Sequence, residues 1–127
     1  MTETWTLLLG GLSAASEPSI LMAIMVGAVI GLFIGALPGL GPTAGVAILL
    51  PVAVSFDGTA AIAALGAVYY GAQYGGAVTA ILLGIPGDSS ATMTVIDGYQ
   101  MAKQGKAGIA LGISVAASFI GGLIGLV

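Results

Sequence analysis

Long apolar stretches alternate with two short polar interruptions along the chain, and this alternation predicts membrane helices separated by breaks. Residues 19–37 carry no charge and come close to the roughly 20 residues that a helix needs to cross a membrane. Residues 59–85 are also uncharged, and they could form one tilted span or two half-helices that meet near residues 71–76. Residues 107–127 form the last apolar stretch. The pattern predicts an all-α polytopic membrane protein with glycine-rich transmembrane helices and broken, re-entrant segments.

Two shorter pieces do not fit a full span. Residues 1–18 are best interpreted as an interfacial segment, with Trp5 at the level of the lipid headgroups and the two glutamates in water. Residues 43–54 are apolar but too short to cross the bilayer alone. Pro42 suits the first position of that helix, where the missing N–H costs nothing. We therefore expect a single membrane domain over residues 1–127.

Small residues recur at helical spacing in the first long stretch. Gly27, Gly31 and Gly35 are each four residues apart, so they lie on one helix face and allow another helix to approach closely. Gly108 with Gly112, and Gly121 with Gly125, repeat this spacing in the last stretch, which adds a candidate packing face there.

Composition excludes several classes of function. Hydrophobic residues make up 58% of the chain and charged residues 6%, and Cys, His, Asn and Arg are absent from the sequence. Disulfides, the usual zinc ligands and a His-activated nucleophile cannot be assembled, so we expect neither an enzyme nor a metal site. With two lysines as the only cations, we expect no nucleic-acid partner.

The first interruption is Leu37-Pro-Gly-Leu-Gly-Pro-Thr43. A helix ends at Pro38-Gly39, because the residue before a proline is pushed out of the helical region. Backbone N–H groups at Gly39, Gly41 and Thr43 could then meet an anion at the start of the next half-helix. The alternative is a tight turn between two packed helices, and the sequence leaves both open.

The second interruption, Pro86-Gly-Asp-Ser-Ser-Ala-Thr-Met-Thr94, concentrates hydroxyl groups in a chain that has few. Asp88 is followed by hydroxyl-bearing residues and is itself a good helix N-cap. The hydroxyls could donate to a carboxylate or bring oxygens to a sodium ion; otherwise the segment is a solvated capping loop. The candidate substrate-binding residues here are Gly87, Ser89, Ser90 and Thr92, and the candidate ion ligands are Asp88 and Thr94.

Polar side chains also mark the middle of residues 59–85. Tyr69 with Gln73 and Tyr70 with Tyr74 are four residues apart, so each pair shares a helix face. If the stretch spans the membrane, Tyr70, Gln73 and Tyr74 would line a transport pathway. If the stretch breaks there, the same residues belong to an interfacial aromatic belt.

The two lysines, Lys103 and Lys106, indicate the topology. Both lie in residues 97–106, which we expect to form a soluble loop, and the positive-inside rule places that loop in the cytoplasm. Asp97-Gly98 within it is interpreted as a turn rather than an ion ligand.

Four segments, taken in order and spacing, resemble the large membrane subunit of the tripartite tricarboxylate transporters, the TctA family. They are Gly35-Ala-Leu-Pro-Gly-Leu-Gly-Pro-Thr43, Tyr70-Gly-Ala-Gln-Tyr-Gly-Gly76, Ala80-Ile-Leu-Leu-Gly-Ile-Pro-Gly87 and Asp97-Gly-Tyr-Gln-Met-Ala-Lys-Gln-Gly105. The resemblance covers roughly residues 19–127. Gly84, Gln100 and the Ser89-Ser90 pair depart from the residues that the family often has, which leaves the substrate open.

The resemblance implies that this chain is the amino-terminal part of a larger, multi-pass subunit of the bacterial inner membrane. It further implies cation-coupled uptake of carboxylates such as citrate, with Na⁺ or H⁺ as coupling ion and no other cofactor. The implied partners are a small four-span membrane subunit and a periplasmic solute-binding protein. The competing hypothesis is a small self-assembling structural or pore-forming protein built on its small-residue stripes.

Overall fold

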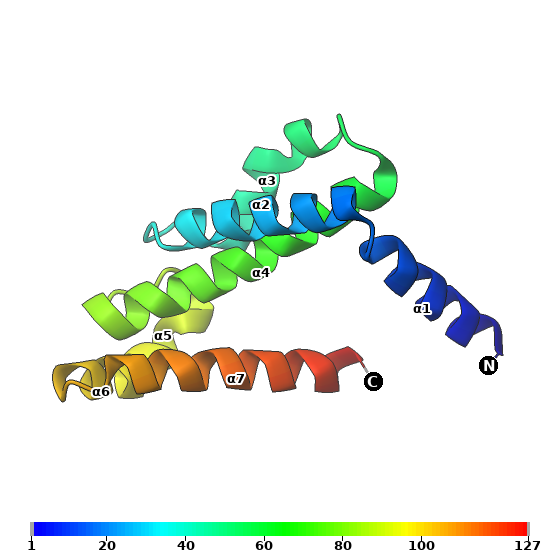
Figure 1. Ribbon diagram of the computed structural model, residues 1–127. Coiled ribbons are helices and arrows are strands. Elements are labelled where there is room, and N and C mark those ends of the chain that lie inside the picture. The colour runs from blue at the N-terminus through cyan, green and yellow to red at the C-terminus, as the bar shows by residue number, and fades with distance from the viewer. Residues whose placement is uncertain (1, 127) are drawn as a thin grey trace.

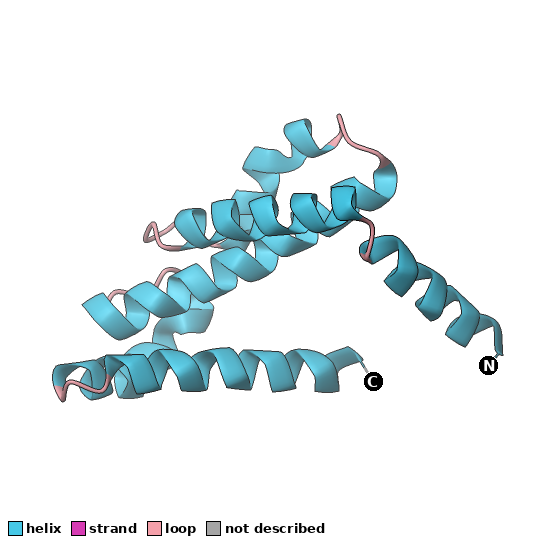
Figure 2. Cartoon of the chain, in the orientation of Figure 1, coloured by secondary structure: helices cyan, strands magenta, loops and turns pink. Residues whose placement is uncertain are grey.

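The computed structural model describes residues 2–126, and that part of the chain is a series of helices joined by short turns, without strands (Figure 2). The long elements are α1 (Thr2–Ala15), α2 (Pro18–Gly35), α3 (Pro42–Ala53), α4 (Gly58–Leu83) and α7 (Ala107–Leu126). Between α4 and α7 lie the 3₁₀ turn η1 (Ser89–Ala91), α5 (Thr92–Thr94), the π-helix η2 (Val95–Tyr99) and α6 (Gln100–Lys103). The all-α prediction is confirmed.

Two of the described helices are long and apolar enough to cross a membrane: α2 over Pro18–Gly35, and α7 over Ala107–Gly125. Helix α4 is longer than either, with 26 residues or about 39 Å of rise, but tyrosines and a glutamine in its middle lower its hydropathy. It continues without a break through Gly71, Gly75 and Gly76. The alternative of two half-helices is therefore wrong, and the alternative of one long helix is correct.

Helices α2 and α4 lie side by side and run in the same direction (Figure 1). A Cβ atom on Gly27 would lie 2.6 Å from the Ala64 carbonyl oxygen, and one on Gly31 or Gly35 would overlap the backbone of Val68 or Ala72. The residue numbers of the contacting pairs increase together along both helices, so α2 and α4 are parallel.

Glycines of α4 form the other side of this contact, which we call the α2–α4 seam. Cβ atoms on Gly71 and Gly75 would overlap the carbonyl oxygens of Ala28 and Leu32. Backbone therefore meets backbone along the whole seam, where Cα–H groups approach carbonyl oxygens. The predicted role of the Gly27, Gly31 and Gly35 stripe is confirmed, and its partner is α4.

Because α2 and α4 are parallel, the chain between them must return across the same depth. Helix α3 covers about 18 Å of that return, whereas α2 rises about 27 Å. Non-helical chain covers the rest, mainly residues 36–41, which include Gly39 at φ +88°. Pro42 is the first residue of α3, as predicted.

After α4 the chain folds back along that helix, forming what we call the 84–103 hairpin. Gly87 reaches Gly76, about two turns before the end of α4, and the helical return leg then brings Gly98 against Ile81 and Tyr99 against Gly84. The hairpin thus descends beside α4 for about two turns and comes back.

The return leg corrects one prediction. Residues 97–106 do not form a soluble loop, because η2 and α6 continue the helix to Lys103 and only residues 104–106 turn. Asp97-Gly98 lies inside the π-helix and is not a turn. Gly98 is buried against Ile81, so its small size serves packing at this position.

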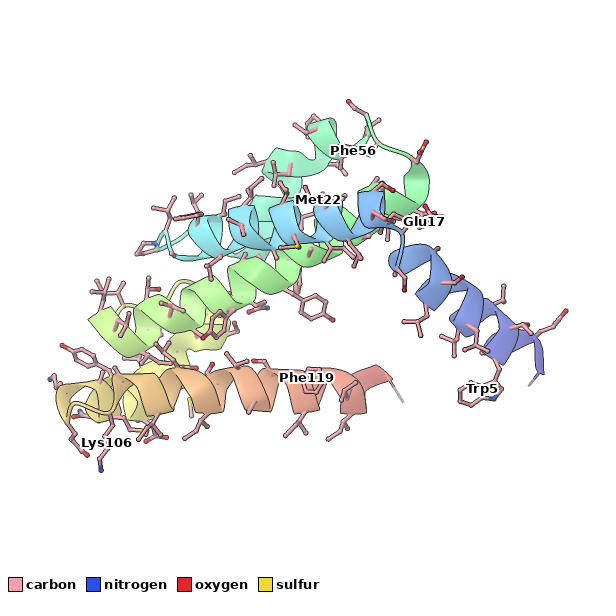
Figure 3. The ribbon with its side chains drawn as sticks, in the orientation of Figure 1. Trp5, Glu17, Met22, Phe56, Lys106 and Phe119 are labelled. Carbon is pink, nitrogen blue, oxygen red and sulfur yellow. The ribbon has the colours of Figure 1, made fainter. Side chains whose placement is uncertain are left out.

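The outer helices make fewer contacts with the rest. Helix α1 projects away from α2, and Trp5 near its start is exposed (Figure 3). Its interfacial position stays a prediction, as does the single domain. On α7, Cβ atoms at Gly108, Gly112 and Gly121 would have nothing within 4 Å among the described residues.

Candidate functional site

The two polar interruptions meet beside the second half of α4. The Gly39 N–H donates a hydrogen bond of 3.1 Å to the Gly87 carbonyl oxygen. A Cβ atom on Gly41 would lie 3.1 Å from Cβ of Asp88, so the second pair of loop residues is also in contact. Segments nearly 50 positions apart in the sequence are thereby joined into one site.

Three glycines make this meeting possible. A Cβ atom on Gly87 would overlap Cα of Gly76 and lie 2.6 Å from the Gly35 carbonyl oxygen. Gly35 is the last residue of α2, and Gly76 lies in the second half of α4. The hairpin tip is therefore seated where α2 ends, at a point where no side chain separates the three backbones.

A chain of polar side chains runs out from this point. The Ser90 hydroxyl hydrogen-bonds the Asp88 carboxylate and lies 3.0 Å from the Gln73 amide oxygen. Gln73 in turn lies within 3.4 Å of the Tyr69 hydroxyl. Asp88 also accepts from the backbone N–H of Ser90 at 2.6 Å, which caps η1 as its sequence position predicts.

The number of available protons sets the direction of this chain of hydrogen bonds. A hydroxyl carries one proton, so Ser90 donates to only one of its two neighbours, and the charged carboxylate of Asp88 is the stronger acceptor. Turning the Gln73 amide end for end then lets its NH₂ group donate to Ser90 and its oxygen accept from Tyr69. In this arrangement Tyr69, Gln73 and Ser90 each donate one hydrogen bond to the next group, and the chain of hydrogen bonds ends on the carboxylate.

These hydrogen bonds determine the charge state of Asp88, which lies in the loop between α4 and η1. The Ser90 hydroxyl lowers the pKa of Asp88, partial burial opposes this, and the backbone N–H groups of Ser90 and Ala91 lower it further. Asp88 is therefore a carboxylate at neutral pH.

Because the pKa of Asp88 is lowered on folding, its stabilising contribution is present above the ordinary aspartate pKa of about 4 and is lost as the pH falls through the lowered value. We expect the difference in melting temperature between the natural protein and Asp88→Asn to be constant from pH 5 to 8 and to shrink below about pH 4. Thermal unfolding across a pH series measures it. A difference that changes near pH 6 would contradict this assignment.

The structure places the predicted residues unequally. It brings together Gly39, Gly41, Gly87, Asp88, Ser90 and Gln73. Thr43, Ser89 and Thr92 are exposed near the same loops, and their side chains form no hydrogen bond within residues 2–126. Tyr70 is 72% exposed and packs edge-on against Tyr69, and Tyr74 is half-buried. Thr94 lines a different cavity, which Asp88 does not line.

Three residues of the site were not among the predicted ones: Tyr69, Gly35 and Gly76. Tyr69 shares its helix face with Gln73, so the four-residue spacing was the available signal. Gly35 and Gly76 come together only in the folded chain, so no local sequence pattern links them to the site. Among the described residues no group of three or more Asp, Glu, His or Cys side chains could hold a metal ion.

This arrangement defines an α-helical membrane protein whose two chain interruptions meet beside the second half of a long helix. The chain matches the Tripartite tricarboxylate transporter TctA family over residues 21–127, and it belongs to that family. It is also similar to an "uncharacterized 52.8 kDa protein in TAR-I ttuC' 3'region" of Agrobacterium vitis, with 46% identity over 114 residues. That match covers 90% of this chain and 23% of the relative, so the chain spans about a quarter of the relative's length. No solved structure matches the chain.

Proposed function

We propose that this chain forms one side of the substrate pathway in a cation-coupled importer of tricarboxylates or related carboxylates. The contact between the two interruptions, made by the Gly39–Gly87 hydrogen bond, is the observation that carries the proposal. Non-helical backbone at membrane depth is tolerated only where it is buried in protein or lines a water-filled cavity. Transporters use such broken segments to hold substrates.

An anion at this site would be held without guanidinium groups, since the sequence has no Arg. Substrate oxygens would be met by the hydroxyls of Ser89 and Thr92, by loop N–H groups, and by the Ser90 hydroxyl once it turns its one proton from Asp88 to the substrate. Asp88 would act as a positioning residue, because its carboxylate fixes the Ser90 hydroxyl through a hydrogen bond.

The distribution of charge supports an orientation. Lys106 lies at one end of the molecule, whereas Glu17 and Phe56, which precedes Asp57, lie at the other (Figure 3). We propose that the lysine end faces the cytoplasm of a bacterial inner membrane, as the positive-inside rule requires. The acidic end would then face the periplasm, where a solute-binding protein delivers substrate. A small four-span subunit would complete the membrane complex.

Substitution of the hairpin hydroxyls tests the proposal in the full-length transporter with its partners. Ser90→Ala removes the hydroxyl that links Asp88 to Gln73 and that would meet the substrate, so we expect uptake of labelled citrate or another accepted carboxylate to fall at least about tenfold. Thr92→Ala removes a hydroxyl that has no hydrogen-bond partner among the described residues, so it should lower uptake by a smaller factor.

Ser13→Ala is the matched control, because within residues 2–126 the Ser13 hydroxyl bonds only to its own helix, at Gly10. Membrane insertion should be equal in all three variants. Sodium-dependent uptake that is unchanged in both hairpin variants would remove this loop from the substrate site.

A further inference from the structure

A cavity lies between η2 and α7, away from the hairpin tip. It has a volume of about 420 Å³, and four oxygen-bearing side chains line it: Thr94 and Asp97 from the return leg, and Ser114 and Ser118 from α7. The rest of the lining is apolar and includes Ile81 and Met101. Ser114 and Ser118 are one turn apart on α7, so both hydroxyls lie on the face that borders the cavity.

The packing of η2 against α4 accompanies the position of Asp97 at this cavity. Gly98 presses η2 against α4, since a Cβ atom at residue 98 would lie 2.7 Å from Cγ1 of Ile81. Asp97 precedes Gly98 and lines the cavity with Thr94, three residues earlier. π-Helical turns are rare and occur often at functional sites.

The four side chains are unpartnered in the part of the chain that the structure describes. None of them forms a hydrogen bond or an ion pair there, and neither lysine lines the cavity. Ser114 and Ser118 belong to the apolar stretch Ala107–Gly125. Asp97 and Ser118 are exposed within the described residues, whereas Thr94 and Ser114 are half-buried. A carboxylate beside an apolar membrane helix is stabilised by a counter-ion.

We propose that this cavity binds a sodium ion. Asp97 supplies two carboxylate oxygens and the three hydroxyls supply one each, and hard cations prefer such oxygen ligands. A single carboxylate neutralises a monovalent ion, whereas a divalent ion would keep an unbalanced positive charge. A proton would need the carboxylate alone and would leave the three hydroxyls without a role. Sodium binding at this cavity does not depend on the proposed function; only its role as the coupling ion rests on that function.

Equilibrium binding of ²²Na⁺ to the purified full-length protein, without carboxylate and without partner subunits, tests the site. Asp97→Asn is expected to weaken Na⁺ binding at least about tenfold, and Ser114→Ala and Ser118→Ala each by a few fold. Asp57→Asn is the matched control, since Asp57 does not line this cavity, and it should bind Na⁺ as the natural protein does. Equal binding by Asp97→Asn and the natural protein, or no Na⁺ binding at all, would overturn the proposal.

A second measurement guards against variants that fail to fold. Replacing choline chloride with sodium chloride at equal ionic strength should raise the melting temperature of the natural protein and of Asp57→Asn. The two serine variants, which keep the carboxylate, should show a smaller rise, and a full rise in both would contradict the site.

Uptake measurements separate this inference from the proposed function. Na⁺ binding that depends on Asp97, in a protein that imports no carboxylate, would retain the ion site and reject the transport proposal. Sodium-dependent uptake that survives Asp97→Asn would retain the transporter and reject the site. Uptake driven by a proton gradient, with no Na⁺ binding, would also reject it.

Discussion

Replacing Gly31 with alanine is expected to separate α2 from α4 and to lower the melting temperature of the full-length protein by at least about 5 °C. The added Cβ atom would overlap the carbonyl oxygen, carbonyl carbon and Cα of Val68. Backbone atoms cannot rotate away as a side chain can, so the helices must move apart. The movement would propagate to Gly35, where α2 supports the hairpin tip. Thermal unfolding in detergent measures the effect.

Gly66→Ala is the control for this experiment. Gly66 lies on α4 itself, and a Cβ atom there would have no atom within 4 Å among the described residues. Alanine in a helix interior is favoured over glycine by about 0.5–1 kcal/mol, so this variant should be as stable as the natural protein or slightly more stable. Gly71→Ala, which approaches the seam from α4, should behave like Gly31→Ala. Equal melting temperatures for Gly31→Ala and Gly66→Ala would contradict the close backbone contact between α2 and α4 at Gly31.

Local rules were sufficient for the apolar helices. The uncharged stretch that becomes α2 ends before Pro38-Gly39, and Pro42 opens α3, because proline acts on its immediate neighbours. The spacing of the α2 glycines likewise predicts a close helix contact, because it depends only on helical periodicity.

Tertiary packing decided what local rules left open. Gly75 and Gly76 are compatible with a break in α4, but contact with α2 keeps the helix continuous: Gly75 packs in the seam, and Gly76 packs against the hairpin tip at Gly87. Asp97-Gly98 has the composition of a turn, yet the fit of Gly98 against Ile81 keeps it helical. Both outcomes depend on a neighbour distant in sequence, which no local window contains.

The candidate site could be predicted in its parts but not in its assembly. Asp88 as an N-cap and the hydroxyls after it follow from the residues of one segment. That the segment meets Gly39 depends on the parallel direction of α2 and α4, which the sequence does not specify. Tyr69 enters the site for the same reason, since Ser90 selects the helix face that carries Gln73.

Replacing Gly87 with alanine is expected to reduce carboxylate uptake by at least about tenfold while most of the protein still inserts and folds. The new Cβ atom would overlap Cα of Gly76 and crowd the Gly35 carbonyl oxygen, so the hairpin tip must lift off α4. Lifting the tip breaks the Gly39–Gly87 hydrogen bond and carries Ser90 away from Gln73. Transport should therefore fall more than stability, because the tip is a loop whereas the α2–α4 seam remains intact.

Gly39→Ala provides the graded comparison at the other side of the same hydrogen bond. Gly39 has φ +88°, so alanine there is strained by about 1–2 kcal/mol, but its Cβ atom would meet no neighbour within 4 Å. We expect uptake to fall less in Gly39→Ala than in Gly87→Ala, with similar amounts of both proteins in the membrane. Uptake rates normalised to protein content in proteoliposomes decide the order. If Gly87→Ala transports as well as the natural protein, contact between the two interruptions is not needed for transport, and the substrate pathway must lie elsewhere.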